Sequence, residues 1–174
     1  LTKIKASNPD AIVLSALIAE GAPIMVQARQ LGITQPFIGG NGMNSVKVFE
    51  LAKGASDGLY VGSPWSASSE APENAKFIKA FEARFKTLPD QFAAQSYDAM
   101  HILAQALGKI RLSGELAADR SALREALPSV KWTGATGAFQ FRRALDKAGK
   151  PAGYDAQQTA IVSVTKGGKF VIEK

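Results

Sequence analysis

Apolar positions in the first third of the chain alternate between short continuous runs and helix-spaced patterns. The run Ala11–Leu17 is nearly continuous, which is typical of a strand buried on both faces of a parallel sheet. Pro23 fits a first helical turn, and Gly32 fits a helix stop. The pattern predicts βαβ units and an open parallel sheet. The expected elements are strands Ala11–Leu17, Pro36–Gly39 and Gly58–Gly62 and helices from Pro23 to Leu31 and over about 44–53.

The pattern changes at Ser63-Pro64, beyond which helical patterns dominate. One of them places Phe77, Phe81 and Phe85 on a single stripe, which we expect to be core. No parallel strand is predicted between these helices, so they lack a sheet to cover their apolar faces. The expected elements are helices over Glu73–Thr87 and about 92–109 and 120–127, a glycine-punctuated turn and strand over Trp132–Phe141, and a hairpin of strands Thr159–Val164 and Lys169–Ile172.

Composition limits the chemistry open to this chain. Its 174 residues are 46% hydrophobic and 21% charged, which suits a folded domain of ordinary size. The longest apolar stretch, Ala11–Ala19, contains Ser15 and is far shorter than the ~20 residues of a membrane span. There is no cysteine and a single histidine, His101, which excludes thiolate zinc sites and cysteine nucleophiles. We therefore expect no catalytic residues, no metal and no cofactor.

A net charge of +6 raises the question of nucleic acid, but the distribution of the basic residues argues against it. Their densest stretch has Arg142, Arg143, Lys147 and Lys150 without the interleaved aromatic residues of a single-strand binder. No helix-turn-helix or zinc-finger pattern occurs either. We expect no nucleic-acid partner.

Two features remain as candidates for binding. Gly39–Gly42 joins a strand to a helix but lacks the spacing of a nucleotide-binding loop. A tight turn without a ligand and a ligand site at the carboxyl end of the sheet both fit it. Trp65 and Phe92 flank the change of pattern, where they fit either the lining of a cleft or the core.

Four segments, in order and spacing across nearly the whole chain, carry a resemblance to a known family. The segments are Asn8–Leu14 leading to Gln27–Gly32, Phe37–Gly42, Pro89–Ala99, and Trp132–Gly137 with Phe141. With these segments the sequence resembles the type I periplasmic binding proteins of branched-chain amino acid ABC transporters. That family has an α/β fold of two Rossmann-like lobes with parallel sheets, which close on a small ligand.

The resemblance implies how the chain divides. Residues 1–63 and 160–174 would form an incomplete second (C-terminal) lobe. Residues 64–159 would be the mostly helical returning part of the first (N-terminal) lobe, with a hinge at Ser63 and Pro64. The chain would then be the C-terminal half of a longer protein, and a missing N-terminal half, or another chain, would supply the first-lobe sheet.

The resemblance also nominates site residues. Leu17 matches a position that often carries a cleft-facing aromatic side chain, and Asn41 matches the acidic residue that receives a ligand ammonium group. Phe92 matches an aromatic residue of the apolar pocket. The expected ligand-binding residues are Ser15, Leu17, Asn41, Gly42, Met43, Trp65 and Phe92.

Two departures from the family pattern bear on the ligand. An ammonium group buried against the neutral Asn41 would lack an opposite charge, and Leu17 is not aromatic. We therefore expect a carboxylate or amide with an apolar or aromatic body rather than a standard α-amino acid.

The expected function is ligand capture without catalysis, as the substrate-binding component of an ABC importer. The expected partners are a small-molecule ligand and the transporter permease, without direct membrane insertion of this chain. The expected location is periplasmic, or extracellular and membrane-anchored in a single-membrane cell. The alternatives are a ligand-sensing domain of a receptor or regulator with the same fold and a nucleotide-dependent α/β enzyme binding at Gly39–Gly42.

Overall fold

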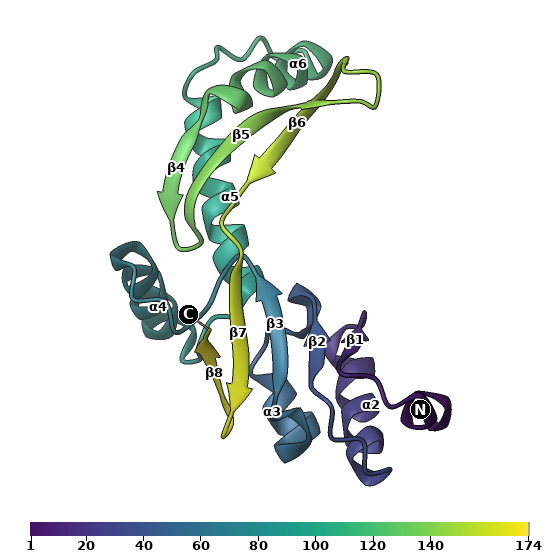
Figure 1. Ribbon diagram of the computed structural model, residues 1–174. Helices are drawn as coiled ribbons and strands as arrows, with labels where there is room; N and C mark the ends of the chain where they lie inside the picture. Colours follow the sequence, from purple (N-terminus) through teal and green to yellow (C-terminus); the bar gives the residue numbers. More distant parts are fainter. Residues whose placement is uncertain (174) are drawn as a thin grey trace. The chain divides into compact units, whose positions relative to one another are not determined.

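A mixed sheet and the helices on one of its faces organise the first part of the chain (Figure 1). The computed structural model describes residues 1–173. The chain divides into two compact units, Leu1–Ser69 with Ala160–Lys174, and Glu70–Thr159. The sequence placed the boundary after Ser63, and the assignment of these units to two lobes stays a prediction.

The sheet of the first unit has the order β1-β2-β3-β7-β8. The first three strands are parallel, and β7 returns antiparallel to β3 and forms a hairpin with β8, as the sequence predicted. The strands are β1 (Ile12–Leu14), β2 (Phe37–Gly39), β3 (Leu59–Ser63), β7 (Ile161–Lys166) and β8 (Lys169–Ile172). The helices are α1 (Thr2–Ser7), α2 (Ile18–Gln30) and α3 (Lys47–Ala52), with 3-10 turns η1 (Asn41–Met43) and η2 (Lys53–Ser56).

Strand β1 is buried on one face only, contrary to the expectation for the first strand. Met25 of α2 and Val48 of α3 pack with the inward side chains, Phe37 and Leu59 among them, in one core. Side chains alternate along a strand, so Val13 points to the opposite face and is 77% exposed. One register row on the face of Val13 consists of Val13, Ile38, Tyr60, Val164 and Val171, and it is exposed at Val13 and Ile38 but buried at Val164.

Helix α2 starts at Ile18, about a turn before the predicted start at Pro23, so the proline lies inside the helix. Two glycines then let the helix approach the loop after β2. A Cβ at Gly21 would lie 2.6 Å from the Sδ of Met43, and a Cβ at Gly39 would lie 2.9 Å from its Cγ. The fully buried Met43 side chain fills this space and fixes the loop to the core.

Arg29 holds the connection between α2 and β2. Its Nη1 donates to the carbonyl oxygens of Ile33 (2.8 Å) and Gln35 (2.9 Å), and its guanidinium lies 5.0 Å from the centre of the Phe37 ring. Partial burial lowers the pKa of this guanidinium from its usual value. The residue therefore ties the end of α2 to the start of β2.

The second unit packs a three-stranded antiparallel sheet, β4-β5-β6, with helices. Ile102, Ala106 and Val130 are its buried centre, with Trp132 and Phe139 packed against them. Strand β6 has proline and glycine and no apolar alternation, so the sequence did not predict it. The elements are α4 (Pro72–Phe85), α5 (Gln91–Leu107), α6 (Leu116–Ala126), the 3-10 turn η3 (Leu127–Ser129), β4 (Lys131–Gly134), β5 (Gly137–Leu145) and β6 (Pro151–Gln157).

The phenylalanine stripe on α4 is buried only at one end, so its assignment to the core was wrong for Phe85. Phe77 is 5% exposed, whereas Phe85 is 55% exposed. The rings of Phe77, Phe81 and Phe85 follow one another with centroid distances of 5.8 and 4.6 Å. Together with Tyr97 and Met100 of α5, they line an apolar groove of about 530 Å³. The β4-β5-β6 sheet packs on a different face of α5, through Ile102 and Ala106, which leaves this groove open.

A buried carboxylate on α5 organises the turn between β4 and β5. Asp98, only 2% exposed, accepts hydrogen bonds from Trp132 Nε1 (2.9 Å), the backbone N–H groups of Ala135 (3.0 Å) and Thr136 (2.7 Å), and Thr136 Oγ1 (2.7 Å). Gly134 leaves room for this contact, because a Cβ there would overlap the Asp98 carboxylate. Asp98 thus joins a helix to a turn far away in the sequence.

Candidate functional site

The carboxyl ends of β1 and β2 meet at one edge of the first unit's sheet, as expected of parallel strands. The loop from β1 into α2 and the loop from β2 into η1 enclose a hollow of about 490 Å³ there. We call this hollow the β1–β2 pocket. Its lining residues are Val13, Leu14, Ser15, Ala16, Leu17, Gly40, Asn41 and Gly42.

Close backbone approach brings the two loops together. A Cβ at Gly42 would lie 2.7 Å from Leu17 Cδ2 and 3.1 Å from the Ala16 carbonyl oxygen. The loop after β2 closes on itself, because the Met43 N–H donates to Gly40 O and the Asn44 N–H donates to Asn41 O, both at 3.0 Å. Gly42 therefore sets how near the loop after β2 lies to Ala16 and Leu17 of the other loop.

We predict that Gly42→Ala weakens ligand binding about fivefold, with little loss of stability. The added methyl group displaces the Leu17 side chain, which is 62% exposed and free to move into the pocket. Calorimetric titration and urea unfolding of the full-length protein measure the two effects. Gly54→Ala is the matched control, because a Cβ at Gly54 meets no atom within 4 Å and Gly54 does not line the pocket. Equal losses in both variants would contradict the role given to Gly42.

Asn44, which the sequence did not single out, holds the loop after β2 in place through buried hydrogen bonds. Its buried Nδ2 donates to Ser63 Oγ (2.9 Å) and to the Trp65 carbonyl oxygen (2.8 Å). These bonds connect the loop after β2 to the chain leaving β3. The sequence around Asn44 contains no pattern that would predict this hydrogen bond to a residue 19 positions away.

The structure brings together four of the residues expected to bind a ligand, Ser15, Leu17, Asn41 and Gly42, around the β1–β2 pocket. The other three lie elsewhere: Met43 is fully buried in the core, Trp65 is 3% exposed, and Phe92 belongs to the second unit, near the start of α5 and 52% exposed. Of the expected hinge residues, Ser63 is buried and Pro64 is half-buried. The ligand and hinge roles of all these residues stay predictions.

The lining of the β1–β2 pocket carries no charged side chain. Its polar side chains are the Ser15 hydroxyl and the Asn41 amide, both exposed, and Leu17 and Val13 contribute apolar surface. Such a lining hydrogen-bonds neutral or anionic groups and contacts an apolar body, but it offers an ammonium group no opposite charge.

Two kinds of feature are absent from residues 1–173. No three His, Asp or Glu side chains gather there in a way that would hold a metal ion. No helix of that range combines the length and the apolar character needed to cross a membrane.

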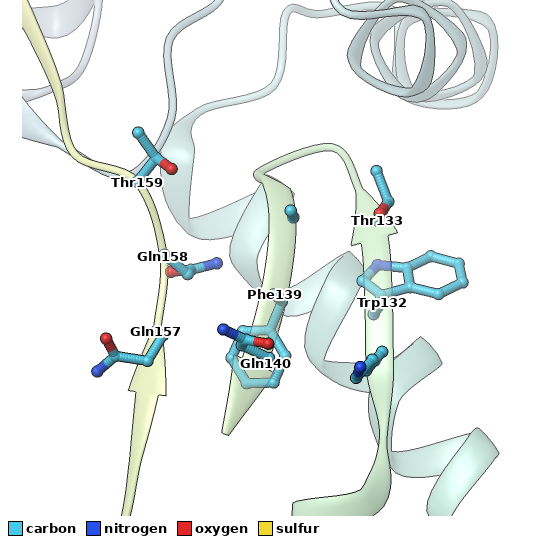
Figure 2. Close-up of a pocket in the computed structure, with 9 residues that line it drawn as sticks. Trp132, Thr133, Phe139, Gln140, Gln157, Gln158 and Thr159 are labelled. Carbon is cyan, nitrogen blue, oxygen red and sulfur yellow. The ribbon is translucent and has the colours of Figure 1, made fainter. Parts of the chain in front are cut away.

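A second hollow, of about 520 Å³, lies in the second unit on β4, β5 and the chain after β6. Figure 2 shows its lining side chains on these neighbouring segments. Lys131, Gln140 and Gln157 form one register row across the three strands, and Gln158 Nε2 donates to Thr136 Oγ1 (2.7 Å). None of the residues expected to bind a ligand lines this hollow.

Comparisons with known proteins agree on one family. The family model described as "Periplasmic binding protein" matches residues 1–169. A leucine-, isoleucine-, valine-, threonine- and alanine-binding protein of Pseudomonas aeruginosa is 26% identical over 141 residues, which cover 81% of this chain and 36% of that protein. This chain thus spans about a third of that relative's length.

Two solved structures are similar over nearly the whole chain. The branched-chain amino acid transporter substrate-binding protein LivJ of Streptococcus pneumoniae, in complex with isoleucine, is 27% identical with a TM-score of 0.76, and the match covers 99% of this chain and 46% of that one. A solute-binding protein of an ABC transporter from R. palustris, in complex with benzoate, is 26% identical with a TM-score of 0.73, and the match covers 98% and 44%.

Proposed function

Because this chain belongs to the periplasmic binding protein family, we propose that it forms part of a solute-binding protein that captures a small molecule for an ABC importer. The β1–β2 pocket, at the sheet edge where α/β folds bind ligands, is the observation that carries this proposal. The first unit would contribute Ser15, Leu17, Asn41 and Gly42 to the ligand. We propose that the two units belong to two lobes and that Phe92 serves the ligand from the second unit.

The pocket lining supports a carboxylate or amide ligand with an apolar or aromatic body. The sequence resemblance implies that Asn41 stands where amino-acid binders of the family carry an acid, and none of the side chains that line the β1–β2 pocket is charged. Burying an ammonium group without an opposite charge is unfavourable by several kcal/mol. The benzoate of the R. palustris structure and the isoleucine of the S. pneumoniae structure belong to those proteins, and they define the two ligand classes to compare.

In this proposal the protein acts in the periplasm, or outside a single-membrane cell, and delivers its ligand to a membrane permease. The remainder of a two-lobed protein would supply the sheet that covers the α4–α5 groove lined by Phe81, Phe85 and Met100. The remainder of the protein would also supply a helix that covers the exposed sheet face around Val13, because parallel sheets in α/β proteins carry helices on both faces.

Titration of the full-length protein with benzoate and with leucine tests the ligand class. We expect benzoate or a related aromatic acid to bind at least about 30-fold more tightly than leucine, as a difference of about 2 kcal/mol requires. Isothermal titration calorimetry measures both affinities. Tight leucine binding without binding of aromatic acids would overturn the ligand class. Solute capture itself would be overturned if the protein bound neither ligand and native mass spectrometry detected no co-purified small molecule.

A further inference from the structure

The outer half of the β5–β6 hairpin extends beyond the core of the second unit (Figure 1). From Arg142 to Ala156 every residue is exposed except the half-buried Ala144. The two strands pair in register from Gln140–Gln157 to Leu145–Pro151, with an irregularity between Ala144 and Leu145. A two-stranded ribbon without cover on either face is marginally stable in water, so a partner would stabilise it.

Positive charge dominates this segment. It contains four cations, Arg142, Arg143, Lys147 and Lys150, and two carboxylates, Asp146 and Asp155. The Asp146 carboxylate accepts the N–H groups of Ala148 (2.8 Å) and Lys150 (2.9 Å) and so shapes the turn. Asp155 lies opposite Arg142 in the strand register.

The four cations are not used for ion pairs within the unit. In the described residues, 1–173, the ion pair with a nitrogen–oxygen distance of 4.0 Å or less joins Arg124 and Glu125, which lie outside the hairpin. The hairpin also exposes two large side chains, Leu145 (60%) and Tyr154 (53%). Arginine and tyrosine beside an apolar side chain are the residue types enriched in protein interfaces.

We propose that the outer half of the β5–β6 hairpin, residues 142–156, is a docking element for an acidic surface of the membrane transporter that receives the ligand. The inference rests on the proposed function and names the surface and chemistry of its protein partner. Unpaired cations attract an acidic partner, and complementary charge of this kind accelerates and orients association. The outer edge of β6, the last strand of its sheet, adds free backbone groups for pairing.

The arrangement of charge favours a protein over a lipid surface. Neighbouring side chains on a strand point to opposite faces, so Arg142 and Arg143 place their charges on both sides of the ribbon. A flat anionic bilayer engages one face only, whereas a groove or a pair of loops on a protein engages both. Asp155 lies opposite Arg142, so the hairpin presents a carboxylate next to a cation. This arrangement suits a protein partner that carries charges of both signs rather than a uniformly negative surface.

Charge reversal of the hairpin tests this proposal. The variant Arg142→Glu, Arg143→Glu, Lys147→Glu, Lys150→Glu is made in the full-length protein and its affinity for the cognate permease complex in nanodiscs is measured by biolayer interferometry. We expect the affinity to fall at least about tenfold, with a larger loss at 50 mM than at 300 mM salt because screening already weakens the wild-type contact. Affinity for the small-molecule ligand should stay unchanged, because these residues lie outside the β1–β2 pocket.

A matched control reverses four exposed cations elsewhere in the same unit, Lys76, Lys79, Arg84 and Arg111, to glutamate. It changes the net charge equally and should leave permease affinity near the wild-type value. Equal losses in the two variants, or no loss in the hairpin variant, would overturn the docking element while intact ligand binding leaves the proposed function standing. Binding of the wild type, but not of the hairpin variant, to vesicles with anionic lipid and without permease would assign the surface to lipid and also overturn the proposal.

Discussion

Asp98→Ala is expected to destabilise the second unit by about 3–5 kcal/mol, the cost of breaking a buried charged network. The Asp98 carboxylate is 2% exposed and accepts four hydrogen bonds, three of them from groups in the β4–β5 turn, Ala135 N and the N–H and hydroxyl of Thr136. Truncation leaves these donors buried without an acceptor. It also frees the indole N–H of Trp132.

Urea unfolding of the full-length protein, followed by far-UV circular dichroism, measures this loss. Asp98→Asn should cost less than alanine, because the amide oxygen still accepts hydrogen bonds, although its NH₂ group faces donors. Asp155→Ala, an exposed carboxylate in the same unit, is the control and should change stability by no more than about 0.5 kcal/mol. A loss in Asp98→Ala no larger than that in Asp155→Ala would show that the turn does not depend on this carboxylate.

Asn41→Asp is expected to reverse the preference of the β1–β2 pocket between the two ligand classes. A carboxylate at residue 41 gives a ligand ammonium group a charged hydrogen-bond partner, worth about 1.5–3 kcal/mol, so leucine affinity should rise about 10- to 100-fold. The same charge repels a ligand carboxylate, so benzoate affinity should fall about tenfold. Asn41 is exposed in the pocket, and the change is isosteric, so the fold should tolerate it.

Competition calorimetry with both ligands measures this switch. Asn8→Asp makes the same chemical change outside the pocket, and the Asn8 Oδ1 that accepts from Gln35 Nε2 is retained as a carboxylate oxygen. It should alter neither affinity. If Asn41→Asp changed both affinities in the same direction, residue 41 would not be the group that distinguishes an ammonium from a carboxylate.

The apolar runs predicted most elements of the first unit because each strand buries one row of side chains. Leu59 and Val61 identify β3, and Phe37 identifies β2, from the sequence alone. The prediction that the first strand is buried on both faces does not hold for residues 1–173, where Val13 is exposed, because an apolar run gives the residue types but not the neighbours that would cover them. A valine at position 13 fits a covered and an uncovered sheet face equally well, so the sequence alone does not distinguish the two.

The site could be predicted only in part, for a similar reason. The chain order placed Ser15 and Leu17 after one strand and Asn41 and Gly42 after the next, and parallel pairing brings those two loops to one edge. Met43 and Trp65 are apolar residues near the same edge, and only packing decides whether such a side chain enters the core or faces a ligand. In the structure both are buried.

The sequence by itself determined the α/β class, the order of the main elements and the family resemblance, because these depend on residue spacing that any fold must respect. The tertiary structure decided which contacts join distant residues. Asn44 reaches Ser63, Asp98 reaches Thr136, and β6 exists because β5 supplies its hydrogen-bond partners. Polar partners and edge strands depend on what lies across the fold, and no local pattern along the chain encodes that neighbour.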